Sequence, residues 1–137
     1  MKHRLDRRLG ACVRGSEMIT ELYVPRERLA AFMEAVRADF RAHQANLIYG
    51  TIRLIEADTE SALPWARSSW ACVIFNLHID HTPEDIERAG HAFRRLIDQA
   101  LHQGGSYYLT YHHFARADQL LAEAGFLVGP RRAVLRP

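Results

Sequence analysis

The sequence predicts an α+β domain of the ferredoxin-like order β-α-β-β-α-β: an antiparallel sheet with helices on one face, plus a C-terminal helix. Three observations lead to this prediction. Four stretches are rich in β-favouring residues, and two longer stretches repeat apolar residues at helical spacing. Along the chain, these stretches follow one another in the β-α-β-β-α-β order. The 137 residues fit one domain, with 1–16 as a lead-in segment and 115–137 as a divergent helical tail.

The first strand and the first helix are expected before residue 45. Residues 17–24 alternate β-favouring and polar side chains, which is typical of a half-buried strand. Pro25 ends this strand and can open a helix at its first turn. Helical spacing then continues to about His43, with an apolar stripe formed by Leu29, Phe32, Met33, Val36 and Phe40.

Two strands are expected in the middle of the chain, Leu47–Ile55 and Trp70–Asp80, with a loop at 56–69 between them. The later strand begins as a continuous apolar run and then alternates. In the earlier strand, side chains alternate between two faces. One face has Ile48, Gly50, Ile52 and Leu54, and the other has Tyr49, Thr51 and Arg53.

The second long helix has a clear start, because Thr82 is a good N-cap and Pro83 suits the first turn. Gly104 and Gly105 end it and lead to a fourth strand at 106–112. A last helix is expected at about 116–124, ending at Gly125. The buried stripe of the second helix is predicted to contain Ile86, Ala89, Phe93, Leu96, Ile97 and Ala100.

Composition and charge argue against several classes of protein. Lys and Arg total 18 against 16 acidic residues, a net charge of +2 that is too small and too evenly spread to indicate nucleic-acid binding. No apolar run approaches the ~20 residues that span a bilayer, and no signal peptide is recognisable. Cys72 lies in an apolar run and is expected to be a buried free thiol. We therefore expect a cytoplasmic protein with neither nucleic-acid nor membrane partners.

Function is expected on the sheet face without helices, because two helices can cover only one face of a four-stranded sheet. The other face must meet solvent, a ligand or another domain. The residues predicted to lie there are Tyr49, Thr51, Arg53, Asn76, His78, Tyr108, Thr110 and His112, and Glu17, Ile19, Glu21 and Tyr23 could join them.

These residue types suit a small polar ligand. Arg53 could hold an anionic or polar substrate through its fork of donors. His78 or His112 could accept a proton near neutral pH. Structural alternatives remain open: Arg53 could pair with Glu21 or Asp80 across the sheet, and His78 could be a cross-strand partner only. Tyr49 and Tyr108 could instead border a dimer interface.

The histidines also raise a metal hypothesis, since His78, Asp80 and His81 are close in sequence and His112 and His113 could approach them. Neighbours along a strand point to opposite faces, however, so His112 and His113 cannot easily bind one ion. There is no HExxH or cysteine-rich pattern, and Gly104-Gly105 is typical of a helix end rather than a phosphate loop. We expect no metal site.

Four stretches resemble the C-terminal substrate domain, or cap, of FAD-linked oxidases of the vanillyl-alcohol oxidase / p-cresol methylhydroxylase superfamily. They are residues 17–26, 48–55, 71–78 and 104–112, the last being the most specific, within a similarity that spans about 5–114. The resemblance implies the ferredoxin-like order described above. It also implies that the cap sheet closes over the isoalloxazine ring of FAD, to which the substrate passes a hydride.

The resemblance also implies roles for individual residues. Thr51 and Arg53 fall where the second strand reaches the substrate, although sugar-alcohol oxidases have an acidic residue at the Thr51 position. Substrate binding would extend to Asn76, His78 and Thr110. Tyr111 and His112 would lie against the flavin, and either His112 or Tyr108 would handle the proton.

Two departures from the family shape the functional expectation. The chain begins near the point where the FAD-binding domain should give way to the cap, and the similarity ends after about Leu120. We therefore expect the substrate-binding part of an FAD-dependent oxidoreductase acting on an alcohol or hydroxy acid, which needs a separate FAD-binding chain and does not retain FAD alone. The alternatives are a stand-alone module that dimerises through its bare sheet face and binds a small molecule, and an inactive remnant.

Overall fold

The computed structural model describes residues 13–60, 66, 68–108 and 113–128. The elements are β1 (Gly15–Pro25), a 3-10 turn η1 (Arg26–Arg28), α2 (Leu29–Ala42), β2 (Leu47–Ile55), β3 (Trp70–Asp80), α3 (Pro83–His102), β4 (Ser106–Tyr107) and α4 (Ala117–Val128). This succession confirms the predicted α+β class. No helix in these ranges is long and apolar enough to cross a membrane.

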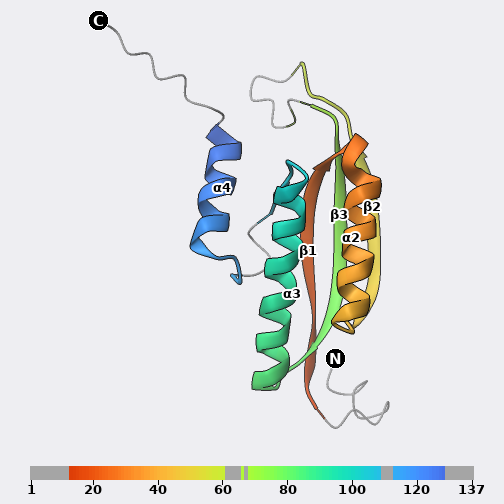
Figure 1. Cartoon of the computed structure of the whole chain (residues 1–137), viewed down its shortest axis with the longest axis vertical. Coiled ribbons are helices and arrows are strands. Elements are labelled where there is room, and N and C mark those ends of the chain that lie inside the picture. Colours follow the sequence, from red (N-terminus) through yellow and green to blue (C-terminus); the bar gives the residue numbers. More distant parts are fainter. Residues whose placement is uncertain (1–12, 61–65, 67, 109–112, 129–137) are drawn as a thin grey trace, which may run out of the picture.

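The four strands form one antiparallel sheet in the order β2-β3-β1-β4. The two central strands, β1 and β3, pair along their whole length, from Gly15 opposite Asp80 to Pro25 opposite Trp70. β2 and β4 are the edges. Figure 1 shows α2 and α3 on the same side of the sheet, running along β3 and β1. A two-layer arrangement results, in which none of the described helices lies over the other sheet face.

The main core lies between the sheet and these two helices. Val73 and Phe75 of β3 meet Phe32 of α2 and Phe93 of α3, all of them buried. The rings of Phe40 and Phe75 pack edge to face, with centroids 5.2 Å apart. Ile86 departs from its predicted place in the buried stripe, because it is 44% exposed in the first turn of α3, before the buried residues begin at Ala89.

The ends of α3 are set by local chemistry. The Thr82 hydroxyl accepts a hydrogen bond from the Asp85 backbone N–H at 3.2 Å, which confirms the predicted N-cap. After the helix, Gly105 approaches the backbone of β1 so closely that an added Cβ would lie 2.0 Å from the carbonyl oxygen of Tyr23. Only glycine allows this contact, which brings Ser106 opposite Tyr23 and starts β4. Residues 109–112 of the predicted fourth strand lie outside the described ranges.

The predicted end of the last helix at Gly125 is wrong, because α4 continues through Gly125 to Val128. A single glycine costs a helix interior only about 1 kcal/mol relative to alanine, so it need not end the helix. Before this position α4 has helix-favouring leucines and alanines, and Phe126, Leu127 and Val128 continue the helix after it.

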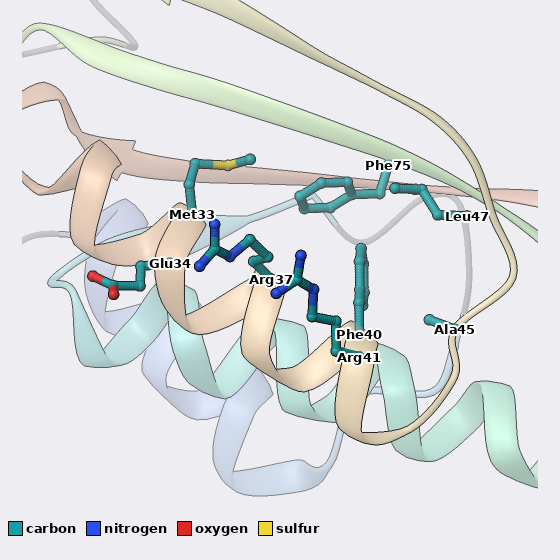
Figure 2. Close-up of a pocket in the computed structure, with 8 residues that line it drawn as sticks. All are labelled: Met33, Glu34, Arg37, Phe40, Arg41, Ala45, Leu47 and Phe75. Atoms are coloured by element: carbon teal, nitrogen blue, oxygen red, sulfur yellow. The ribbon is translucent and has the colours of Figure 1, made fainter.

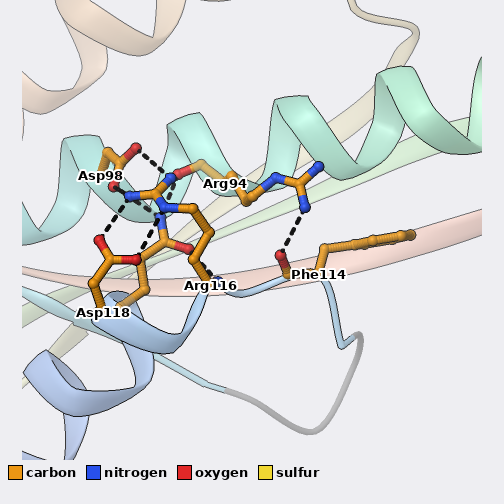
Figure 3. A network of polar contacts seen from close by, with 6 residues as sticks. Arg94, Asp98, Phe114, Arg116 and Asp118 are labelled. Carbon is orange, nitrogen blue, oxygen red and sulfur yellow. Dashed lines mark hydrogen bonds and ion pairs between the residues drawn. The ribbon is translucent and has the colours of Figure 1, made fainter.

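A polar network attaches the start of α4 to α3 (Figure 3). The Arg116 guanidinium donates to both carboxylate oxygens of Asp98 at 2.9 and 3.1 Å and also pairs with Asp118. These bonds lower the pKa of Asp98 and of Asp118. Gln119 is 1% exposed; its side chain accepts from the Arg116 N–H and donates to Asp98 and to the Arg94 carbonyl. Part of the expected divergent tail is therefore anchored to the core.

We expect Gln119→Ala to lower the free energy of unfolding by about 1–3 kcal/mol, because it removes a buried side chain that makes three hydrogen bonds between α4 and α3. Urea denaturation followed by circular dichroism measures this change. Leu121→Ala is the matched control, since Leu121 lies in the same helix and is 74% exposed. Equal stability of the two variants would show that the network does not hold α4 in place.

Candidate functional site

The sheet face without helices, here called the open face, presents three rows of side chains across β1, β3 and β2. Their positions follow from the strand register, because the alternate residues of β3 belong to the helix-side core. Tyr108 follows β4 on the same face, since Tyr107 before it lies in the core. The rows are Tyr23, Cys72 and Arg53; then Glu21, Ile74 and Thr51; then Ile19, Asn76 and Tyr49.

The open face is less bare than the sequence predicts. Tyr23, Trp70, Cys72 and Ile74 form a second, smaller cluster of buried residues with Ala66, which comes from the segment between β2 and β3. The Ala66 carbonyl accepts a hydrogen bond from the Asp58 N–H at 2.7 Å, which ties this segment together. The accessible polar groups therefore lie around the cluster rather than at its centre.

Glu21 is the hydrogen-bond acceptor at the middle of the open face. The Tyr23 hydroxyl and the Cys72 thiol, the latter at 3.4 Å, both donate to the same oxygen of its carboxylate. The backbone N–H of Tyr108 donates to the Glu21 carbonyl at 2.9 Å and so brings the Tyr108 side chain beside this group. Two neutral donors thus orient one carboxylate.

The donors of this cluster hold their protons strongly. Burial raises the pKa of Cys72 to about 12, with a further contribution from the charge of Glu21 and an opposing one from Arg53. Burial also raises the pKa of Tyr23 far above its usual value, again reinforced by Glu21. Tyr23 and Cys72 therefore act as hydrogen-bond donors at neutral pH, and the Glu21 carboxylate is their common acceptor.

Arg53 is the cation of the open face. It is exposed, lies in the same row as Cys72 and lowers the pKa of that thiol by its charge. In the described part of the chain it forms neither of the ion pairs weighed from the sequence, with Glu21 or with Asp80. An exposed guanidinium of this kind suits an anionic ligand.

Asn76 and His78 lie toward the opposite end of the face from Arg53. Asn76 is 3% exposed and donates to Glu17 at 3.2 Å, while its Oδ1 has no partner. The His78 ring lies 3.3 Å from Asp80 and crosses over Gly15, where an added Cβ would be 2.6 Å from the imidazole. His78 is about 20 Å along β3 from Cys72. Its contacts fit the structural alternative of a cross-strand partner.

The remaining site predictions have different outcomes. Thr51 lies beside Arg53 on the open face. Thr110, Tyr111 and His112 fall outside the described residues, so their roles stay predictions. His81, from the metal hypothesis, instead bonds Ser16 at 2.7 Å. Within the described ranges no group of three or more His, Cys, Asp or Glu side chains could hold a metal ion.

The described residues fit a substrate better than they fit FAD. A pyrophosphate group needs a glycine-rich loop or a free helix N-terminus. At the N-terminus of α3, Thr82 already caps the helix, and Glu84 and Asp85 in the first turn would repel a phosphate. Carboxylate, phenol and guanidinium groups on the open face suit a small polar molecule instead.

A separate groove of about 640 Å³ lies on the helix side, between α2 and the start of β2 (Figure 2). Met33, Phe40, Leu47 and Phe75 line it, and Arg37 and Arg41 border it. A bulge in β2 between Leu47 and Tyr49 turns Leu47 to this side, opposite Leu77 of β3. The groove is thus separated from the open face by the sheet.

Comparison of the chain with protein-family models, with curated proteins and with solved structures gives no match.

Sequence reasoning placed Glu21 on this face but gave it no role beyond pairing with Arg53. The sequence feature that points to such a role is the pair of acidic residues at 17 and 21, whose spacing places both on one face of the strand. Tyr23 is expected from the sequence as a possible member of this face and Cys72 as a buried thiol, but their contact with Glu21 depends on the register of β1 against β3, which opposes them directly.

We expect the protein to lose stability between about pH 9 and pH 12. In the unfolded chain Cys72 and Tyr23 ionise near their ordinary pKa values of 9.0 and 10.0, whereas in the folded protein both pKa values are raised. Unfolding then releases protons, so the free energy of unfolding falls as the pH rises. Urea denaturation at pH 8, 9.5 and 11 measures the slope.

The matched variant is Glu21→Gln, which removes the charge but keeps an acceptor for both donors. Its stability should fall less steeply over the same range, because Glu21 contributes to both shifts. Identical slopes for the two proteins would show that Glu21 does not act on Tyr23 and Cys72.

Proposed function

We propose that this chain is the substrate-facing part of a flavin-dependent oxidoreductase. It binds a hydroxy acid, or an alcohol with a similar polar group, on the open face, while a separate domain or chain holds FAD. The observation on which this depends is the placement of an oriented carboxylate, Glu21, and an exposed guanidinium, Arg53, in adjacent rows of a face without helices.

The spacing supports a small ligand that reaches both groups at the border of the buried cluster. Their backbones lie two strands and one row apart, so their Cα atoms are separated by about 12 Å. Both side chains are long enough to reach into that space. Arg53 would hold the carboxylate of a hydroxy acid, and Glu21 would accept the proton of its hydroxyl group as the hydride leaves. The Tyr108 hydroxyl would border the same space.

The resemblance to FAD-linked oxidase caps supports the choice of reaction class. FAD, when held by its own domain, supplies the acceptor for the hydride. The residues of this chain supply substrate orientation and the proton acceptor. The assignment differs from the sequence expectation in one respect, since Glu21 takes the proton that His112 or Tyr108 was expected to take. A cytoplasmic location is part of the same proposal.

Mandelate is a suitable probe, because it combines an aromatic ring, a hydroxyl group and a carboxylate. We expect its addition to ¹⁵N-labelled protein to shift amide signals of residues 21–23, 51–53 and 106–108. Benzyl alcohol, which lacks the carboxylate, should bind at least about tenfold more weakly. Arg53→Gln should abolish the difference between the two probes while leaving the melting temperature nearly unchanged.

Signals that shift only around Met33, Phe40 and Leu47 would instead assign binding to the helix-side groove and refute the proposed site. A large loss of stability in Arg53→Gln would mark that residue as structural.

The purified chain should be colourless, because a cap domain alone offers only part of a flavin site. Visible absorption after incubation with FAD and gel filtration tests this expectation. Stoichiometric flavin retained through the column would show that the chain holds the cofactor itself.

A further inference from the structure

β2 is exposed to an unusual degree for a strand of a folded sheet. Eight of its nine residues are exposed, and five of them are large apolar side chains, with Leu54 the most exposed at 64%. It forms one edge of the sheet, and Arg53 is its single charged residue. Long apolar edges are normally blunted by charge, proline or a covering element, because their free backbone groups pair with other chains.

We propose that β2 is a dimer interface, in which it pairs antiparallel with β2 of a second copy, centred on Thr51. A two-fold axis between antiparallel strands places one residue opposite itself. Thr51 is the middle residue of Leu47–Ile55, so this register pairs the regular part of the strand, residues 49–53, with its own copy. Both sheets then join into one, with the helices of both copies on the same side.

This register is self-complementary on the open face. Thr51 lies opposite the partner's Thr51, a favourable cross-strand pair. Tyr49 lies opposite the partner's Arg53, which places a guanidinium against an aromatic ring. Moving the centre to Ile52 would put Arg53 opposite the partner's Thr51 and lose this contact. The charge of the strand therefore selects the register.

The helix side of the strand is equally suited to a second copy. Ile48 lies opposite the partner's Leu54, and Gly50 lies opposite the partner's Ile52, so an exposed apolar row becomes covered. The partner's Leu54 then comes to rest beside Leu47, at the groove shown in Figure 2.

Dimerisation through the edge fits better than dimerisation through the open face, which was the sequence expectation. The centre of the open face is already buried, with Cys72, Ile74 and Asn76 each less than a tenth exposed. Edge pairing leaves the rest of that face accessible. Because stacking uses the flat side of the guanidinium, the in-plane N–H donors of Arg53 stay free for an anion. That last point rests on the proposed function, whereas the interface itself does not.

Sedimentation equilibrium over a range of concentrations tests the association. We expect a reversible dimer whose dissociation constant rises at least about tenfold in Leu54→Lys. Leu121→Lys is the matched control, since it places the same charge at an exposed leucine of α4. Circular dichroism shows that each variant is folded. A monomer at all concentrations, or equal weakening by both substitutions, would overturn the proposal.

Cysteine cross-linking tests the register, in a Cys12→Ser background where Cys72 is buried and slow to ionise. Directly opposite residues have Cα atoms about 4.5–5.5 Å apart, close enough for a disulfide. Thr51→Cys should therefore form a covalent dimer on oxidation. Ile52→Cys should not, because its two copies would be about 8 Å apart, beyond disulfide reach. Cross-linking by Ile52→Cys, or by neither variant, would refute the register.

The same samples separate this inference from the proposed function. A Thr51→Cys disulfide dimer, together with no response of the unsubstituted protein to mandelate, would support the interface and refute the ligand site. Mandelate-induced shifts on the open face of a protein that stays monomeric would support the ligand site and refute the interface.

Discussion

The pairing of β1 with β3 is the constraint on which the rest of the molecule depends. Eleven residues of each strand are opposed without a break, so the side of the sheet that each residue occupies is fixed along the entire ladder. A shift of one residue would turn the core toward solvent and Glu21, Tyr23 and Cys72 into the core. Burial of the apolar set beneath α2 and α3 therefore also determines which polar groups meet on the open face.

The fold was predictable to the extent that it depends on local pattern. The bounds of β2 and β3 and the Thr82 cap follow from alternation and capping chemistry, and they agree with the structure. The course of α4 through Gly125 was not predictable, since it depends on neighbouring residues that outweigh one glycine. The site was predictable only as a set of residues on one face. Which of them touch, such as Tyr23 and Cys72 with Glu21, depends on register and on the packing of Ala66.

β2 connects the proposed ligand site with the proposed interface. Alternate residues of this strand face opposite sides, so Thr51 and Arg53 border the open face while Ile52 and Leu54 remain exposed on the helix side. A second copy would cover the apolar row and leave the polar row beside a substrate. The apolar row serves the proposed interface alone, whereas Arg53 takes part in both proposals, since it sets the register and faces the ligand.

The approach of Gly105 to the Tyr23 carbonyl has a consequence for how this protein can vary. The backbone at Gly105 leaves no room for even a methyl group, so any other amino acid there would push Ser106 and Tyr107 away from β1. Tyr108 would move with them and leave the neighbourhood of Glu21. A turn with no reactive group thus limits the sequences compatible with the site, and homologous chains that keep the chemistry should keep glycine at this position.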